Sequence, residues 1–216
     1  MTGVLLDLDG TLTDPKVGIT GSIRYALETL DLPVPTEAEL LRFIGPPLRE
    51  SFDRLFGDAS LTQRCLALYR ERFGTIGLYE NLVFEGVPEM LDALKVSGYR
   101  LVLATSKPHV FARRILDHFG LTPRFSAIHG AELDGIRANK AELIGHILAT
   151  EEIAPQSAIM IGDRLHDMHA AAARGMKAIG VLYGYGDEAE LLGAGAIMTV
   201  RTPMEIPAAV TQLLPL

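Results

Sequence analysis

The sequence of 216 residues holds a single cysteine, Cys65, and no apolar run that approaches the length needed to span a bilayer. One thiol excludes an internal disulfide and a zinc site built from several cysteines. A membrane-spanning helix would need about 20 consecutive apolar residues. A basic segment followed by a cleavable apolar one is also lacking before the first strand-like run, so secretion is not expected. We therefore expect a reducing, cytoplasmic location.

Positive charge is scarce as well. The chain has 20 Lys and Arg against 27 Asp and Glu, which gives a net charge of −7 and a pI near 5.4. This balance argues against nucleic-acid polymers as partners, because they are bound largely through phosphate contacts with cations. No membrane partner is expected either. A small anionic substrate stays compatible, since a metal ion and a few local cations can outweigh a distant net charge.

Two patterns divide the chain, which is long enough for one large domain or one domain with a smaller insert. Helical spacing dominates residues 15–83, where no convincing strand is found and helices are expected at 18–32, 36–43, 48–56 and 61–73. Thr36 and Glu39 have the spacing of a capping box. From residue 87 onward, strand-length apolar runs alternate with helices, which implies crossovers and a parallel sheet. Strands are expected at 4–6, 99–105, 125–129, 157–163, 177–182 and 196–200, and helices at 88–96, 108–119, 140–150, 166–174, 186–193 and 203–214.

Three of the buried-type strands end in polar residues. The first runs into Asp7 and Asp9, the second into Thr105-Ser106-Lys107, and the third into Asp163, with Asp167 one helical turn beyond. Alone, Asp7 and Asp9 are more typical of a polar turn after a buried strand than of a metal site. In an open parallel sheet, however, ligands bind outside the carboxyl ends of the strands. Three polar strand ends therefore predict a site at this edge.

Four short motifs stand in a fixed order along the chain: residues 7–13, Thr105, Lys140, and Gly162-Asp163-x-x-x-Asp167. Together they resemble the motifs of the haloacid dehalogenase superfamily, in particular its phosphatases with a helical cap inserted after the first strand. Residues 104–108 and 162–167 look like those of proteins named phosphoglycolate phosphatase or 5′-nucleotidase. The resemblance implies a Rossmann-like parallel α/β core of residues 1–14 and 84–216, and a small α-helical cap domain of residues 15–83.

The resemblance also implies roles for the acidic residues. Asp7 would be the nucleophile that forms an aspartyl-phosphate, and Asp9 the general acid and then the general base. Asp9 needs a raised pKa for this role, which proximity to ionised Asp7 would supply. Mg²⁺ is the expected cofactor, with oxygen ligands from Asp7, Asp163 and the backbone carbonyl of Asp9. Asp167 would support the metal shell or orient a metal-bound water.

Phosphate and substrate contacts are expected from two parts of the chain. Thr105 and the backbone amides around Gly10 and Ser106 would hold the phosphoryl oxygens, and Lys140 would offset the charge of the phosphate and of Asp7. Lys107 fits either a site residue or a surface residue at a helix start. Arg49, just after a Gly-Pro-Pro turn in the cap, fits either a substrate contact or a surface arginine.

Other polar features are expected to lie outside the catalytic set. His166 and His169 are read as supporting or surface residues, and the remaining histidines lack the spacing of a metal triad. Residues 183–186, Tyr-Gly-Tyr-Gly, lack the G-x-G-x-x-G pattern of a dinucleotide site and are expected to form a loop after the last main strand.

These assignments predict a Mg²⁺-dependent phosphomonoesterase acting on a small phosphorylated metabolite, such as phosphoglycolate or a nucleoside monophosphate, in a monomer or homodimer. A dehalogenase is disfavoured, because that branch needs neither the acid at Asp9 nor a Mg²⁺ site. Two alternatives stay open: a sugar phosphomutase of the β-phosphoglucomutase type, and a non-catalytic binding or regulatory module on the same scaffold. Mg²⁺-dependent phosphate release distinguishes the phosphomonoesterase from the non-catalytic module.

Overall fold

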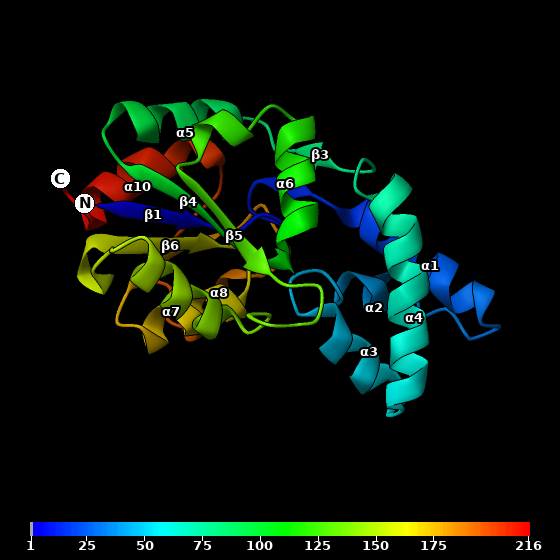
Figure 1. The fold of residues 1–216 in the computed structure, drawn as a ribbon. Helices are drawn as coiled ribbons and strands as arrows, with labels where there is room; N and C mark the ends of the chain where they lie inside the picture. Colours follow the sequence, from blue (N-terminus) through cyan, green and yellow to red (C-terminus); the bar gives the residue numbers. More distant parts are fainter. Residues whose placement is uncertain (1) are drawn as a thin grey trace. The chain divides into compact units, whose positions relative to one another are not determined.

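A computed structural model describes residues 2–216, and the chain divides into two compact units. The first, which we call the core unit, combines the chain up to Asp14 with Val83–Leu216. The second, the helical unit, is Pro15–Leu82 (Figure 1). The core unit is thus discontinuous in sequence, and the helical unit is inserted after its first strand.

Within the described residues, the core unit contains a six-stranded parallel sheet in the order β5-β4-β1-β6-β7-β8. The strands are β1 (Gly3–Leu6), β4 (Arg100–Pro108), β5 (Ala127–Ala131), β6 (Ala158–Gly162), β7 (Lys177–Val181) and β8 (Met198–Val200). Leu5 of β1 lies in register with Val102 on one side and Met160 on the other. Because both faces of β1 are covered, its residues form a continuous apolar run.

Helices cover both faces of this sheet. They are α5 (Val87–Val96), α6 (His109–His118), α7 (Lys140–Thr150), α8 (Leu165–Ala173), α9 (Glu188–Gly193) and α10 (Ile206–Leu213). In Figure 1, α5 and α10 lie on one side of the sheet and α7 and α8 on the other. Leu143 and Ile147 of α7 and Met168 of α8 pack with sheet residues in one buried cluster. The predicted α/β class with a parallel sheet is confirmed.

The helical unit contains α1 (Lys16–Thr29), α2 (Glu37–Leu41), α3 (Leu48–Phe56) and α4 (Ala59–Arg72). The predicted capping box is present: the Thr36 side chain accepts from the Glu39 amide, and the Glu39 carboxylate accepts from the Thr36 amide. A π-helical turn, Phe73–Gly77, follows α4 and was not predicted. The turn lies close against α1, because a Cβ on Gly18, far earlier in the sequence, would lie 2.0 Å from the Gly77 carbonyl oxygen.

Two short strands also depart from the sequence prediction. β2 (Thr13–Asp14) and β3 (Leu82–Val83) pair in a separate two-stranded sheet, so the prediction of no strand within 15–83 was wrong at its end. Each is two residues long, which is too short for a periodic signal. β4 extends through Pro108, where a helix start was predicted, and its pairing with β5 shifts register between Thr105 and Pro108. Among the described residues, no helix is long and apolar enough to cross a membrane.

Candidate active site

The carboxyl ends of the three central strands bring distant polar residues together. Asp7 directly follows β1, Thr105 and Lys107 lie near the end of β4, and Asp163 directly follows β6. The Asp7 amide donates to the Ile161 carbonyl of β6 at 3.0 Å, which fixes the end of β1 against its neighbour. The chain passes from β1 to β4 on one side and returns through β6 on the other. The polar residues therefore lie where the winding of the sheet reverses.

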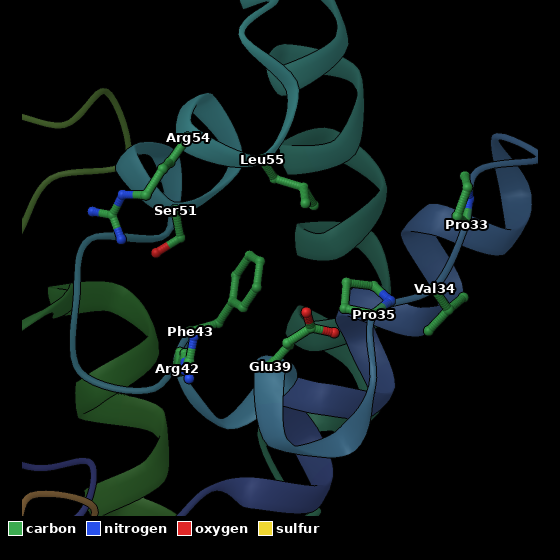
Figure 2. Close-up of a pocket in the computed structure, with 9 residues that line it drawn as sticks. All are labelled: Pro33, Val34, Pro35, Glu39, Arg42, Phe43, Ser51, Arg54 and Leu55. Carbon is green, nitrogen blue, oxygen red and sulfur yellow. The ribbon is translucent and has the colours of Figure 1, made fainter.

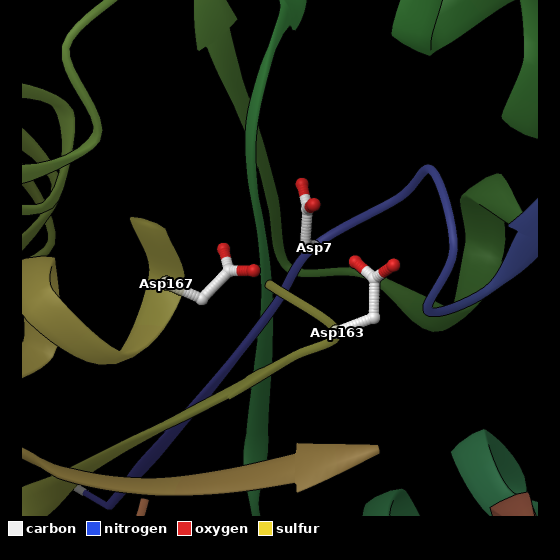
Figure 3. Close-up of side chains that lie close together, drawn as sticks. All are labelled: Asp7, Asp163 and Asp167. Atoms are coloured by element: carbon white, nitrogen blue, oxygen red, sulfur yellow. The ribbon is translucent and has the colours of Figure 1, made fainter. Parts of the chain in front are cut away.

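An acid cluster of Asp7, Asp163 and Asp167 occupies this edge. One carboxylate oxygen from each lies within 4.8 Å of the others, and all three residues are buried. Figure 3 shows the three side chains directed toward a common space, Asp7 from just after β1, Asp163 from just after β6 and Asp167 from α8. Gly162 permits this approach, because a Cβ there would lie 2.2 Å from Cγ of Asp167.

Lys140, at the start of α7, is the counter-charge to the cluster. Its Nζ lies 2.8 Å from Oδ1 of Asp7 and 2.8 Å from Oδ1 of Asp167. Asn139 caps α7 by accepting from the backbone amides of Ala141 and Glu142, which fixes the point where the lysine leaves the helix. Burial alone would lower the pKa of Lys140, but the charges of Asp167 and Asp7 outweigh it and raise the pKa above its ordinary value.

Lys107 is buried, 8% exposed, and its Nζ lies 2.7 Å from Oδ2 of Asp9. The alternative of a surface lysine at a helix start is thus wrong, because β4 continues past residue 107 before α6 begins. Burial raises the pKa of Asp9, while Lys107 acts in the opposite direction. The nearby Asp7, expected to be the main cause, makes a smaller contribution than burial.

Several buried oxygens at the site have no partner within the described residues. Asp163 Oδ1, Asp9 Oδ1 and the Thr11 hydroxyl accept or donate no hydrogen bond there. Burial and the charges of Asp167 and Asp7 raise the pKa of Asp163 well above its ordinary value, and burial together with Asp7 raises that of Asp167 to about 6 despite Lys140. A hard divalent cation bound here would relieve the repulsion between these carboxylates and give the unpaired oxygens a partner. The residues present therefore fit a Mg²⁺ ion.

The loop of residues 183–186 contributes to the site, which sequence reasoning missed. The Tyr185 amide donates to Asp163 Oδ2 at 2.9 Å, and the Tyr183 hydroxyl donates to the Thr11 carbonyl at 3.0 Å. A Cβ on Gly184 would lie 2.4 Å from Cβ of Asp163. The two glycines alternating with tyrosines were the available signal, since a close backbone approach requires glycine.

The remaining phosphate-site candidates of the core unit lie beside the cluster. Gly10 has φ +82°, and a Cβ there would lie 2.0 Å from Asp163 Oδ2, so only glycine fits. Thr105 is buried, and its hydroxyl accepts from the Lys107 amide at 3.2 Å. Ser106 between them is half-buried.

Arg49 belongs to the helical unit, where its guanidinium donates to the Gln63 side chain at 2.8 Å. Its predicted contact with substrate stays a prediction. Neither histidine of α8 belongs to the acid cluster. His166 is half-buried, and burial lowers its pKa, whereas His169 is exposed.

The fold is thus a parallel α/β core with a buried acid cluster and a buried lysine at the carboxyl edge of its sheet, an arrangement that fits a divalent cation. The chain belongs to the haloacid dehalogenase-like hydrolase family, whose model matches residues 4–181. It is an enzyme of this family, as the names of its relatives also indicate.

Three relatives and one solved structure illustrate the similarity. A 5′-nucleotidase of Pseudomonas aeruginosa is 51% identical, over 87% of this chain and 86% of that protein. Tyrosine-protein kinase PtkA of Mycobacterium tuberculosis is 40% identical, over 85% of this chain and 62% of that protein. A phosphoglycolate phosphatase of Agrobacterium fabrum is 32% identical, over 85% of this chain and 81% of that protein. The crystal structure of a predicted phosphatase from Clostridium acetobutylicum has a TM-score of 0.94 and 40% identity, over 99% of this chain and all of that one.

Proposed function

We propose that this protein is a Mg²⁺-dependent phosphomonoesterase that hydrolyses a small phosphorylated metabolite through an aspartyl-phosphate on Asp7. The observation that carries the proposal is the position of Asp7. Its Oδ1 lies 2.8 Å from Nζ of Lys140, and one of its carboxylate oxygens lies within 4.8 Å of an oxygen of Asp163 and of Asp167. A carboxylate held ionised by cations can act as a nucleophile at neutral pH.

In the first half-reaction, a carboxylate oxygen of Asp7 attacks phosphorus while the bond from phosphorus to the ester oxygen breaks. Asp9, two residues on, gives its proton to the departing alkoxide. In the second, water attacks the phosphorus of the aspartyl-phosphate, Asp9 takes a proton from that water, and the bond to Asp7 breaks to release phosphate. A raised pKa suits Asp9 for the first step, because the residue must arrive protonated.

Charge on the transferred phosphoryl group is the main obstacle, and in this proposal Lys140 and the neutral donors at the strand ends offset it. Lys140 touches Asp7, and the hydroxyl of Thr105 and the backbone around Gly10 and Ser106 line the same strand ends. Bound Mg²⁺, held by Asp7, Asp163 and the Asp9 carbonyl with Asp167 in support, would supply further neutralisation of the phosphoryl oxygens.

A direct test uses p-nitrophenyl phosphate with purified protein, with Mg²⁺ and with EDTA. We expect Mg²⁺-dependent release of phosphate by the wild type and a loss of at least about 1,000-fold in Asp7→Asn, because the amide is not a nucleophile. Asp134→Asn, an exposed change in the same unit, is the matched control. Undiminished release by Asp7→Asn would exclude the proposed intermediate.

A panel of phosphate esters addresses the substrate. Relatives named 5′-nucleotidase and phosphoglycolate phosphatase support nucleoside monophosphates and phosphoglycolate as the first substrates to assay. A sugar phosphate converted to its isomer without phosphate release would favour a phosphomutase. Transfer from ATP to a tyrosine peptide, the activity named for another relative, is a further arm, and transfer without hydrolysis would overturn the phosphatase proposal.

We also propose a cellular location and an oligomeric state for the enzyme. A buried, free Cys65 fits a reducing compartment, so we keep the cytoplasm as the proposed location. A monomer or homodimer is proposed as the assembly, without nucleic-acid or membrane partners. Light scattering after size-exclusion chromatography distinguishes the two oligomeric states.

A further inference from the structure

The helical unit holds a pocket of about 450 Å³, formed by the α1–α2 connection, α2 and α3 (Figure 2). The charged side chains of its lining, Glu39, Arg42 and Arg54, are all exposed to solvent. The buried charged side chains of the described residues lie instead at the carboxyl edge of the core unit's sheet. That edge, and not the pocket, is where the surroundings of a polar group are closely controlled.

The turn that carries Asp9, residues 8–13, takes its shape from its own backbone. The Leu8 carbonyl accepts from the Thr13 amide at 3.0 Å, and the Thr13 carbonyl accepts from the Gly10 amide at 2.8 Å. These bonds set the shape of the turn. Its orientation against the sheet depends in addition on contacts with other segments of the core unit.

Two tyrosines of the loop at residues 183–186 supply such contacts. The Tyr183 hydroxyl donates to the Thr11 carbonyl at 3.0 Å, inside the turn. The Tyr185 hydroxyl donates to Oδ1 of Asp14, in β2, directly after the turn. The two phenol groups therefore bind the turn and the short strand that follows it.

Other residues fix the two tyrosines in turn. The Phe84 ring meets the Tyr183 ring edge to face with centroids 5.1 Å apart, and the Phe84 amide donates to the Leu12 carbonyl at 3.1 Å. The Tyr185 amide donates to Oδ2 of Asp163 at 2.9 Å. The loop thus connects the turn after β1 with the residue that follows β6.

The orientation of the turn decides where the Asp9 carboxyl group points. Its Oδ2 lies 2.7 Å from Nζ of Lys107, and its Oδ1 has no hydrogen-bond partner within the described residues. Oδ1 is therefore the oxygen available to carry the proton that the proposed reaction transfers. A general acid must lie within hydrogen-bond reach of the leaving oxygen, so a small displacement of the turn removes much of its effect.

We propose that Tyr183 and Tyr185 are positioning residues, which hold the turn of residues 8–13 so that Asp9 can protonate the leaving oxygen. In that step the bond from phosphorus to the ester oxygen breaks, and the Asp9 proton passes to the departing oxygen. Neither phenol group touches the reacting atoms, because both act through the backbone that carries the acid. The inference rests on the proposed phosphatase function and adds to it the residues that orient its acid.

The test compares two substrates of similar shape whose leaving groups differ in their need for a proton. p-Nitrophenolate leaves phosphorus readily without protonation, whereas the more basic phenolate of phenyl phosphate needs the acid. At saturating Mg²⁺, kcat/KM reports cleavage of the ester bond and not the later hydrolysis of the aspartyl-phosphate. We expect Tyr183→Phe and Tyr185→Phe each to lower kcat/KM by roughly tenfold for phenyl phosphate and by less than about threefold for p-nitrophenyl phosphate.

Tyr99→Phe is the matched control. The Tyr99 hydroxyl also donates to a carbonyl, that of Leu214 at 2.8 Å, and its side chain is buried just before the start of β4, away from the carboxyl edge. This variant loses the same kind of hydrogen bond, so its thermal stability should fall. The ratio of its kcat/KM values for the two substrates should equal that of the wild type.

Asp9→Asn provides the reference, because it removes the acid itself. It should lower kcat/KM for phenyl phosphate more than for p-nitrophenyl phosphate, by a larger factor than either tyrosine variant. In the Asp9→Asn background, Tyr183→Phe should change kcat/KM for phenyl phosphate by less than about twofold, since no acid is left to position. A tyrosine that supports only the fold would have the same effect in both backgrounds.

The outcomes separate this inference from the proposed function. If the wild type and Asp9→Asn behave as expected, equal losses for both substrates in the tyrosine variants, or no loss, would overturn the positioning role alone. An Asp9→Asn variant without preference between the substrates would overturn the acid assignment and the inference with it. Absence of Mg²⁺-dependent release from either substrate by the wild type would overturn the phosphatase proposal as well.

Discussion

The ammonium group of Lys107 lies 2.7 Å from Oδ2 of Asp9, and both side chains are buried at the carboxyl edge of the sheet. Burial raises the pKa of the Asp9 carboxyl, whereas Lys107 holds it down by its charge and its hydrogen bond. A residue that must first release and then accept a proton works best between these two influences. Lys107 therefore tunes the group proposed as the acid and base of the reaction.

Replacing Lys107 with Met should reduce the free energy of unfolding by about 3 kcal/mol, because a buried carboxylate then loses its partner. The loss should fall below about 1 kcal/mol when Asp9 is already Asn, since no charge is left to compensate. Urea unfolding of the four proteins of this double-mutant cycle, in EDTA, measures both values. A loss of equal size in the two backgrounds would mean that Lys107 stabilises the fold through packing alone.

Lys140→Met should affect both stability and turnover. Asp7 and Asp167 would lose a cation at 2.8 Å, so unfolding in EDTA should become easier by about 3–5 kcal/mol. Saturating Mg²⁺ should recover a larger share of stability in the variant than in the wild type, while phosphate release falls by at least about 100-fold. Thermal unfolding with and without Mg²⁺, beside steady-state rates, provides the measurement. Equal Mg²⁺ effects in both proteins would contradict the proposed charge balance.

Gly184→Ala tests the loop that holds Asp163. The added Cβ would lie 2.4 Å from Cβ of Asp163 and 2.4 Å from the Gly10 carbonyl oxygen, where backbone cannot give way. We expect Mg²⁺ affinity to fall by roughly 10-fold or more, measured by calorimetric titration, because the carboxylate that we propose as a metal ligand is displaced. Gly193→Ala is the matched control, since no heavy atom lies within 4 Å of its Cβ position. Unchanged affinity in Gly184→Ala would remove the loop from the site.

The acid cluster predicts an unusual pH dependence for the metal-free protein. The pKa of Asp167 is raised to about 6 in the folded chain, so the folded state holds this proton more tightly than the unfolded state. The resulting stability is present below about pH 4 and is lost as the pH rises through about 6, by an amount on the order of 3 kcal/mol. Asp163, whose pKa is also raised, acts in the same direction.

Unfolding free energies in EDTA, measured from about pH 4 to about pH 7, check this slope. The difference between wild type and Asp167→Asn isolates it from the surface carboxylates, such as Glu37, whose pKa is lowered and which act in the opposite direction. Added Mg²⁺ should raise the Tm more at the upper end of this range, because the cation competes with protons for the same oxygens. A wild-type curve parallel to that of Asp167→Asn would refute the expectation.

Much of the core unit follows from local pattern. Continuous apolar runs predicted β1, β4 and β6, since strands buried on both faces need no alternation. Lys140–Thr150 was predicted with its observed bounds, and the structure shows that Asn139 caps its first turn. The convergence of Asp7, Thr105 and Asp163 followed from one topological rule about parallel sheets.

Other features depend on what approaches from elsewhere in the chain. The burial of Lys107 required knowing that β4 continues to Pro108, although the proline itself signals a helix start. The role of Gly184 depends on Asp163 lying beneath it, which no local pattern contains. The π-helical turn Phe73–Gly77 depends in the same way on Gly18, far earlier in the sequence. Sequence reasoning failed where the role of a residue depends on contact with a segment that is distant in the sequence.

The place of β1 at the centre of the sheet has a consequence for synthesis on the ribosome. β1 is the first strand of the described chain, yet its two partners come much later, β4 from Arg100 and β6 from Ala158. A nascent chain that has emerged only as far as α5 therefore carries an apolar strand with both edges unpaired, while the whole helical unit is already available to fold. Asp7 is therefore synthesised early but can approach Asp163 only after β6 has emerged and paired with β1.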